Sequence, residues 1–202
     1  MTEPIRPAAT VVLWREGLSG PEVLMGQRGE AAAFMPSKFV FPGGRVDPED
    51  HPSARQGFLT PDCVRRLAQL VPEDAPQPGA IVAAALRELT EETGLNLAAM
   101  DRPSLRFVFR AITPPGRSRR FDARFLLAHA EGLEGDGEDF SAASGELQHL
   151  SWLPLPQARA LDLPFITEVV LAEVAALVAG GGPPRRPVFY NFRPTPQFRR
   201  LV

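Results

Sequence analysis

The segment from Ala80 to Thr93 constrains the fold most strongly, because its apolar residues follow a helical period. Val82, Leu86 and Leu89 repeat at intervals of four and three residues, which predicts one buried stripe along a helix. Gly94 follows at the place where a helix commonly ends in a left-handed residue. We therefore expect a long helix that packs against another element through this stripe.

Shorter segments on both sides of this helix carry strand and helix signals. The predicted strands are Ala8–Trp14, Glu22–Met25, Phe39–Phe41, Leu105–Ile112, Phe121–Ala128 and Leu150–Leu153. Further helices are predicted after Thr60 as N-cap, with an apolar stripe of Val64, Leu67 and Val71, and at Pro156–Leu161 and Pro164–Val178. Helices interspersed among short strands imply an α/β or α+β layered domain. The Pro/Arg-rich tail, residues 180–202, receives no assignment.

Composition narrows the class of protein. The 202 residues suit a single domain, and 44% hydrophobic with 23% charged residues is ordinary globular usage. The net charge of −2 argues against a protein that wraps nucleic acid or lies on an anionic membrane. Cys63 is the single cysteine, so no internal disulfide can form and a reducing cytoplasm is the expected location. No apolar run reaches the roughly 18 residues of a membrane span, and no secretory leader is evident.

The acidic residues of the long helix gather on a face of their own. Glu88, Glu91 and Glu92 stand at i, i+3 and i+4 near the helix end. Like charges at this spacing cost about 0.2–0.5 kcal/mol per pair, and acids near a C-terminus also oppose the helix dipole. Arg87 offsets part of this repulsion, and a hard divalent cation would relieve the rest. The alternative interpretation is a solvated acidic face.

A second feature favours the cation. The predicted strand Phe39–Phe41 stops at Pro42-Gly43-Gly44, a bend where the backbone can approach a ligand closely. The carbonyl of Gly43 would add a neutral oxygen to the carboxylates. Oxygen-only ligation of Mg²⁺ or Mn²⁺ is how many enzymes handle phosphate anhydrides.

These two motifs together resemble the Nudix hydrolase signature, Gly-x5-Glu-x7-Arg-Glu-U-x-Glu-Glu-x-Gly-U, in which U is bulky and apolar. The second half is matched by Arg87-Glu88-Leu89-Thr90-Glu91-Glu92-Thr93-Gly94-Leu95. In the first half, counted from Gly44, the first acid falls at Asp50, and the distance from Asp50 to Arg87 is far longer than the family spacing. The resemblance implies a Nudix-type α/β/α sandwich with a mixed central sheet, interrupted by a helical insert at residues 50–78.

Insert-bearing Nudix proteins form a branch that includes a peroxisomal coenzyme A diphosphatase, and the chain resembles that branch. The likeness lies in Phe34-Met35-Pro36, in the run from Arg119 to Phe125 and in the run from Leu161 to Thr167. The chain has Ser37 where the branch usually has glycine, and it lacks the histidine that marks dedicated coenzyme A hydrolases. The final Arg200-Leu201-Val202 is not a peroxisomal address, so the expected location stays cytoplasmic.

The resemblance also implies roles for individual residues. Glu88, Glu91, Glu92 and the Gly43 carbonyl would hold Mg²⁺ or Mn²⁺, and Arg87 would orient the glutamates. The general base would be Glu146, which lies in the loop before Trp152, or Glu88 instead. Glu138 and Asp139 in the same loop are competing choices, and the alternative for all the loop acids is plain solvation.

Arginines and the insert are the candidates for substrate contacts. Arg45, Arg120 and Arg124 are predicted to bind the substrate, with exposed turn arginines as the alternative for the last two. Arg120 and Arg124 share a strand face. Phe39 and Phe41 are assigned either to base stacking or to core packing. The insert would form a cap over the substrate pocket or a contact between two copies of the chain, and Cys63 within it would be inert packing.

The predicted activity is hydrolysis of a diphosphate bond in a nucleoside diphosphate linked to another moiety, such as a coenzyme A-like or ADP-ribose-like compound. The expected partner is thus a small molecule, not nucleic acid or a membrane. The alternative function is a catalytically silent Nudix domain that binds a nucleotide derivative as a sensor. An interaction protein built around the tail is a third class, and no specific residue favours it.

Overall fold

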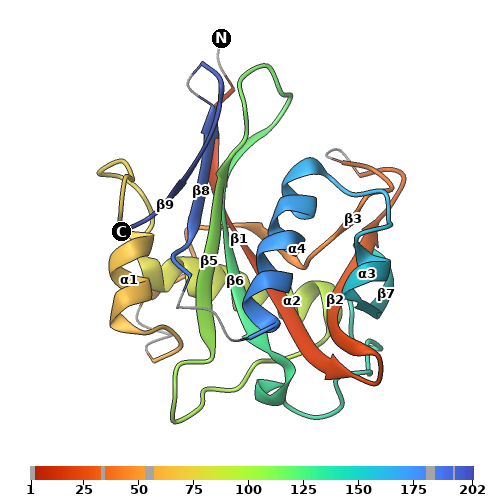
Figure 1. Cartoon of the computed structure of the whole chain (residues 1–202). Coiled ribbons are helices and arrows are strands. Elements are labelled where there is room, and N and C mark those ends of the chain that lie inside the picture. The colour runs from red at the N-terminus through yellow and green to blue at the C-terminus, as the bar shows by residue number, and fades with distance from the viewer. Residues whose placement is uncertain (1–2, 33–34, 53–56, 181–184, 193) are drawn as a thin grey trace.

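A mixed sheet forms the central layer of the computed structural model, which describes residues 3–32, 35–52, 57–180, 185–192 and 194–202 (Figure 1). Its strands are β1 Ile5–Gly17, β2 Gly20–Arg28, β3 Phe39–Val40, β4 Gly43–Arg45, β5 Leu105–Ile112, β6 Arg120–His129, β7 Leu147–Pro154, β8 Val188–Phe192 and β9 Pro196–Arg200. The main order is β3-β2-β1-β6-β5-β8-β9, while β4 pairs with β1 and β7 with β2. The β1–β6 and β5–β8 pairs are parallel and the other named pairs are antiparallel.

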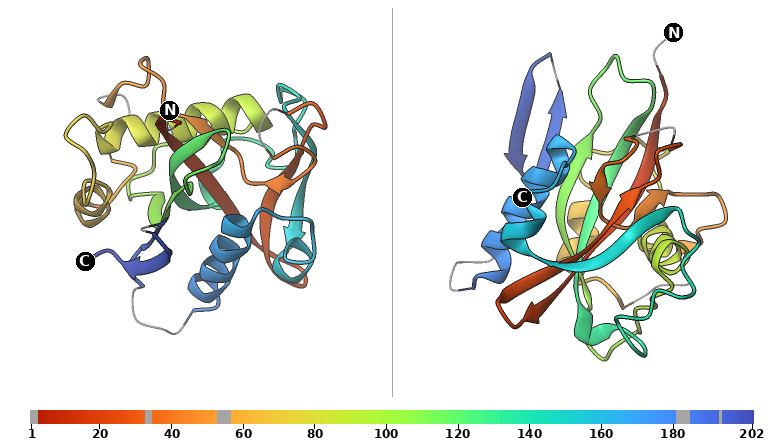
Figure 2. Two further views of the ribbon diagram at one scale, coloured as in Figure 1. Left: turned by 90° about the horizontal axis from the view of Figure 1, so that it is seen from above. Right: turned by 90° about the vertical axis from the view of Figure 1, so that its right-hand side faces the viewer.

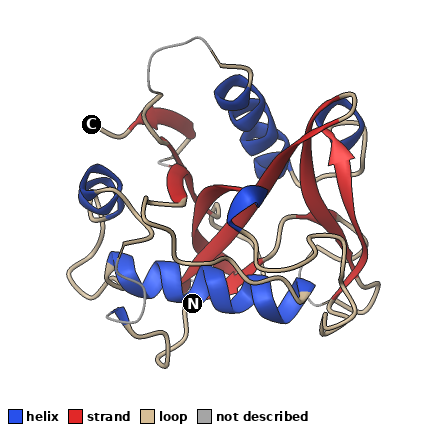
Figure 3. Cartoon of the chain, turned by 90° about the horizontal axis from the view of Figure 1, so that it is seen from below, coloured by secondary structure: helices blue, strands red, loops and turns tan. Residues whose placement is uncertain are grey.

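Helices cover both faces of this sheet (Figure 2, Figure 3). They are α1 Pro61–Leu67, α2 Pro78–Thr93, α3 Leu155–Ala158 and α4 Phe165–Val178, with a short 3-10 turn, η2, at Ala130–Gly132. One apolar core joins α1 and α2 to the sheet, and a second core joins α3 and α4 to it. The predicted α/β/α sandwich with a mixed central sheet is thereby confirmed. No helix in the described ranges combines the length and apolar character that a bilayer span requires.

Helix α2 forms as its pattern predicts. Val82, Leu86 and Leu89 are all buried in the core beneath it. Gly94 takes a left-handed backbone, with φ of 79°, and its N–H donates to the carbonyl of Thr90 at 2.8 Å. The apolar stripe thus fixes which way the acidic face of the helix points.

The described part of the insert contains the short helix α1, which packs beside β5. Thr60 caps α1 by accepting from the Cys63 N–H at 3.2 Å, as predicted. The predicted stripe through Val64 is wrong: Val64 is 42% exposed, and Cys63 packs in the core with Leu67 instead. Helix α1 of the insert lies at the N-terminal end of α2, whereas the acidic residues lie toward the other end of that helix (Figure 1).

The C-terminal tail, which received no assignment from sequence, forms the antiparallel pair β8 and β9. Strand β8 extends the sheet beyond β5, and all of β9 is exposed at the edge. Leu201 then turns inward and is buried in the same core as α1. The side chain of Gln69 donates to the carbonyl of Val202, so the tail and the insert support each other.

Candidate active site

The double-glycine bend lies directly against the acidic end of α2. Strand β4 pairs with β1, which sets Gly43 opposite Thr10. The Gly43 N–H donates to Oε2 of Glu92 at 2.7 Å. A side chain at Gly44 would displace the carboxylate of Glu88, which shows how closely this acid approaches the bend. The two halves of the motif, far apart in sequence, are therefore in contact.

The buried carboxyl of Glu92 is the most perturbed acid of this cluster. Glu92 is only 3% exposed, and its pKa is raised to about 8. Burial is the main cause, and the negative charges of Glu88 and Glu146 add to it. The Gly43 N–H and the positive charge of Arg28 act in the opposite direction. Burial and neighbouring charges together therefore disfavour the ionised form of Glu92.

Glu88 also has a raised pKa. Burial raises the pKa of Glu88, and the charges of Glu91 and Glu146 raise it further, while Arg87 opposes them. Glu91 differs from the other two helix acids because its side chain is 55% exposed. Thus Glu88 and Glu92 form the inner part of the cluster, and Glu91 stands at its rim.

Arg87 holds the bend and the acids together. Its guanidinium donates to Glu88 at 2.9 Å, to Glu91 at 3.2 Å and to the carbonyl of Arg45 at 2.9 Å. Two further bonds of 3.1 Å reach both oxygens of Asp50, which is 8% exposed. The hydrogen bonds to Asp50 are the main cause of the raised pKa of Arg87. This geometry fits the predicted orienting role, and it gives Asp50 a place that the sequence spacing alone did not reveal.

The loop before β7 carries Glu146 to the same cluster. Its Ser144 N–H donates to the carbonyl of Glu91 at 2.8 Å, and the Trp152 indole donates to the carbonyl of Gly137 at 2.9 Å. Because the Glu146 charge acts on both inner acids, its carboxylate lies within their electrostatic reach. Glu138 is instead paired with Arg15 at 2.6 Å.

Asp139, the other competing loop acid, accepts from the Ser141 N–H at 3.0 Å within its own loop. Hydrogen bonds to Ser141 lower the pKa of Asp139. Of the three acids that the sequence offered as a base in this loop, Glu146 is the one that the structure brings to Glu88 and Glu92.

The predicted substrate arginines lie in three different settings. Arg45 follows Gly44, is 54% exposed in its side chain and stands 3.4 Å from Asp47. Arg120 donates to the carbonyl of Thr113 at 3.0 Å in the β5–β6 hairpin. Only Arg45 therefore adjoins the bend directly.

Arg124 is the exception among these arginines. Its residue is 1% exposed, and its guanidinium lies 3.0 Å from Asp122. Burial lowers the pKa of Arg124 to about 10, against the attraction of Asp122 and together with the repulsion of Arg110. Direct contact with a substrate does not fit this buried location. The strand pattern predicted which face Arg124 occupies, but it could not predict that other residues cover that face.

The predicted aromatic residues belong to the core. Phe41 is 4% exposed, and Phe39 packs against the same apolar cluster under α3 and α4. Core packing, rather than stacking on a base, accounts for both positions.

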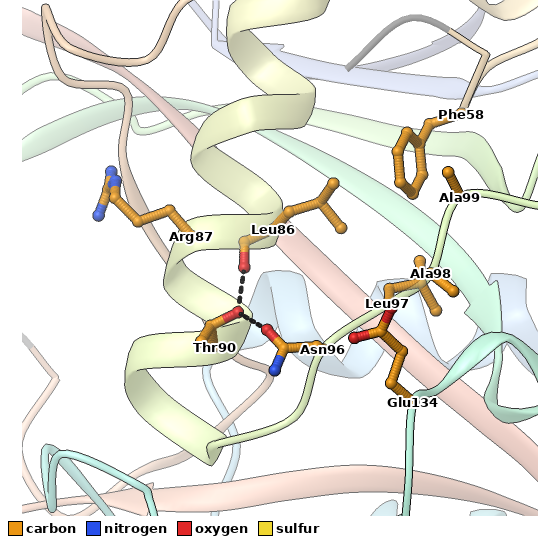
Figure 4. A pocket seen from close by; sticks show the side chains of 9 residues that line it. All are labelled: Phe58, Leu86, Arg87, Thr90, Asn96, Leu97, Ala98, Ala99 and Glu134. Atoms are coloured by element: carbon orange, nitrogen blue, oxygen red, sulfur yellow. Dashed lines mark hydrogen bonds between the residues drawn. The ribbon is translucent and has the colours of Figure 1, made fainter. Parts of the chain in front are cut away.

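A cavity of about 190 Å³ lies on another flank of α2, shown in Figure 4. Thr90 and Asn96 are joined across it by a 2.8 Å hydrogen bond, and Phe58 and Glu134 complete its wall. Arg87 also lines this cavity, but its guanidinium points away from the other lining side chains (Figure 4) and bonds to Glu88. Arg87 thus stands between the cavity and the acids.

The donor set of the acidic cluster fits a hard divalent cation. Its groups are carboxylates beside the backbone of Gly43, and a cation would offset both the burial and the charge repulsion that raise the pKa of Glu92. Within the described residues, no three acidic, histidine or cysteine side chains already converge as a metal-binding group. Arg87 engages Glu88 and Glu91, and the Gly43 N–H engages Glu92, so the carboxylates would reorient when a cation binds.

Comparison with known proteins decides the family. The family model described as NUDIX domain matches residues 4–174. The chain belongs to this family. The Nudix chain is similar to the NUDIX hydrolase from Alicyclobacillus acidocaldarius, with 27% identity, a TM-score of 0.61, and coverage of 88% of this chain and 93% of that one. The chain is thus a hydrolase that acts on pyrophosphate bonds, and members of its family generally use divalent metals.

Two further solved structures share the Nudix fold. The Ap4A hydrolase of C. elegans, in a binary complex, is 19% identical, with a TM-score of 0.54 and coverage of 88% of this chain and 100% of that one. The NUDIX domain of Shewanella oneidensis NrtR, complexed with ADP ribose, is 14% identical, with a TM-score of 0.54 and coverage of 87% and 89%. No curated protein matches the chain.

Proposed function

We propose that this Nudix hydrolase cleaves the diphosphate bond of a nucleoside diphosphate linked to another moiety. The observation that carries the proposal is the contact of Gly43 and Gly44 with Glu92 and Glu88, which brings the glycine bend directly against the helix acids. The similar structures named for Ap4A hydrolysis and for an ADP ribose complex support a nucleotide derivative as the substrate class. A coenzyme A-like compound belongs to this class through the branch resemblance.

The acidic cluster would hold Mg²⁺ or Mn²⁺ through Glu88, Glu91, Glu92 and the Gly43 carbonyl. When bound, such an ion stabilises charge on phosphoryl oxygens and makes water a better nucleophile. Arg87 keeps the glutamates in place through its bonds to Glu88 and Glu91. We assign Arg45 to the substrate side of the bend, because it is the exposed arginine next to Gly44.

We assign the general base to Glu146. Its carboxylate acts on both inner acids, whereas Glu88 already accepts a 2.9 Å bond from Arg87. The proton taken from the attacking water would reside on a Glu146 carboxylate oxygen. Glu146→Gln should lower kcat by about 10²–10⁴-fold while Mn²⁺ affinity stays close to wild type. Glu131→Gln, which removes an exposed acid, is the control; unchanged turnover in Glu146→Gln would return the role to Glu88.

The substrate class is tested with a panel of coenzyme A derivatives, ADP-ribose, nucleotide sugars, dinucleoside polyphosphates and NADH. Each compound is incubated with Mg²⁺ or Mn²⁺, and products are identified by mass spectrometry. We expect at least one compound to be cleaved at its diphosphate and Glu92→Gln to abolish that cleavage. Binding without cleavage across the panel would favour the sensor function, and cleavage that persists in Glu92→Gln would contradict the site.

A further inference from the structure

Arg28, which had no part in the predicted site, ends strand β2 beside the acidic cluster. Its N–H donates to the carbonyl of Lys38 at 2.9 Å, and its carbonyl accepts from the Ser37 N–H at 3.1 Å. On the other side of β2, Arg28 stands opposite Leu147 of β7. Leu147 directly follows Glu146, so the strand pairing brings Arg28 next to the residue assigned as general base.

The side chain of Arg28 projects to the face of the sheet that α2 covers. Leu24 of the same strand lies in the core with Leu86 and Leu89 of α2. Side chains alternate along a strand, so Gly26 and Arg28 share the face of Leu24. The β2–β7 register shifts between Met25 and Gln27, but the extra residue lies in β7, so the alternation along β2 is kept. The Arg28 charge accordingly acts on Glu92 at the end of α2.

The guanidinium of Arg28 has hydrogen-bonding capacity that the chain does not use. Its Nε is buried and finds no hydrogen-bond partner within the described residues. The nearby Glu92 carboxylate accepts from the Gly43 N–H instead. A buried donor without a partner is energetically costly, and an unsatisfied group of this kind in a native protein calls for an explanation. Arg87 provides the contrast, because all of its terminal nitrogens donate within the site.

We propose that Arg28 binds the non-bridging oxygens of the substrate diphosphate. The planar guanidinium donates two parallel N–H bonds to a phosphoryl group, a geometry that the point charge of lysine does not reproduce. Arg28 would thereby stabilise negative charge on the phosphate opposite the cation-binding carboxylates. The assignment rests on the proposed function and adds to it a catalytic residue outside the family motif.

This role predicts opposite effects on two ligands. A positive charge beside carboxylates opposes cation binding but favours phosphate binding. Loss of Arg28 should therefore leave Mn²⁺ affinity unchanged or slightly increased, and it should weaken the binding of a diphosphate. A residue that merely supported Glu92 would weaken both together.

The experiment measures Mn²⁺ binding, and then imidodiphosphate binding in saturating Mn²⁺, by calorimetry on the whole chain. In Arg28→Gln we expect imidodiphosphate to bind about 10- to 100-fold more weakly, with kcat/KM for the cleaved substrate reduced to a similar extent. Arg28→Lys should recover part of the affinity. Arg102→Gln removes an exposed positive charge in the segment before β5 and serves as the matched control.

Four outcomes would overturn the assignment. If Arg28→Gln binds imidodiphosphate as tightly as the wild-type chain does, Arg28 has no role in binding the diphosphate. Hydrolysis by the wild-type chain would then still support the proposed function. Equal losses of Mn²⁺ and imidodiphosphate binding would show a supporting role only. If Arg28→Gln fails to fold, Arg28→Lys decides: full wild-type affinity there contradicts the two-bond contact. Failure of the wild-type chain to bind or hydrolyse any diphosphate with Mn²⁺ would remove both proposals.

Discussion

The molecule contains two clusters of charged side chains, one with an excess of carboxylates and one with an excess of guanidinium groups. The acidic cluster consists of Glu88, Glu91, Glu92 and Glu146 with Arg87. It carries more carboxylates than its arginine can neutralise. The arginine cluster, Arg110, Asp122 and Arg124 on β5 and β6, carries two guanidinium groups for one carboxylate. The two differ in how the surrounding chain treats the excess charge.

In the arginine cluster the chain itself supplies the acceptors that Arg110 needs. Arg110 makes two 2.7 Å bonds to Asp122, and its remaining nitrogen donates to the carbonyls of Gln69 and Leu70 after α1. The ring of Phe189 lies 4.5 Å from the same guanidinium. The insert and the tail therefore seal this cluster, and its charges serve the packing of the insert.

In the acidic cluster the described residues supply fewer donors than the inner carboxylates can accept. Glu92 is buried with one N–H bond and a raised pKa, and Glu91 at the rim is open to solvent. The comparison shows that excess charge alone does not mark a ligand site. Excess charge indicates a ligand site where the chain leaves that charge unpaired and close to solvent.

The largest effect is expected from breaking the sealed cluster. Asp122→Asn removes the one carboxylate between two buried arginines, so the free energy of unfolding should fall by about 3–5 kcal/mol. Urea denaturation measures the change, with Asp62→Asn at the exposed start of α1 as the control. Near wild-type stability in Asp122→Asn would mean that the arginine cluster is not sealed.

Removing one inner acid should act on activity instead of stability. Glu88→Gln should lower kcat/KM by about 10²–10³-fold, because the cation loses a ligand and Arg87 loses a partner. The melting temperature without metal should hold or rise, since a carboxyl whose pKa is raised by burial and by its neighbours is removed. If Glu88→Gln lost much stability and little activity, the acidic cluster would serve the fold, as the arginine cluster does, and not the reaction.

The acidic cluster should also make the metal-free protein sensitive to pH. The pKa of Glu92 is about 8 in the folded chain against an ordinary value of 4.5, so the folded state holds its proton more tightly than the unfolded state. Stability should therefore fall as pH rises from about 5 to 8, by an amount on the order of 2 kcal/mol.

Thermal unfolding in a chelator across this pH range measures the effect. Added Mg²⁺ should flatten the profile, and Glu92→Gln should flatten it without metal. Stability that increases over the same range in the metal-free wild type would contradict the assigned state of Glu92.

Local patterns predicted those parts of the structure that local physics decides. The stripe of Val82, Leu86 and Leu89 fixed α2, and Gly94 marked its end, because helix period and left-handed glycine act within a few residues. The match of Gly43 and Gly44 to the family pattern indicated the bend that contacts the acids.

Features set by distant pairing were not accessible from sequence. The tail shows no clear alternation, and β8 exists because β5 offers it a parallel partner. Arg28 is a single arginine at the end of a strand, and its proximity to Glu146 comes from pairing with Leu147, far along the chain. Asp50 reaches Arg87 only because the intervening insert folds away from the site.

Arg124 gives the smallest expected effect and the sharpest test of the contrast. It was assigned to the substrate because it shares a strand face with Arg120, yet it is buried and its Nε has no partner among the described residues. Arg110 already satisfies Asp122 with two bonds, so Arg124→Met exchanges an incompletely satisfied charge for an apolar chain. We expect a change in stability within about 1 kcal/mol of wild type and an unchanged KM, measured by urea denaturation and steady-state kinetics. A KM raised tenfold with stability intact would return Arg124 to the substrate site and place the two clusters in one functional unit.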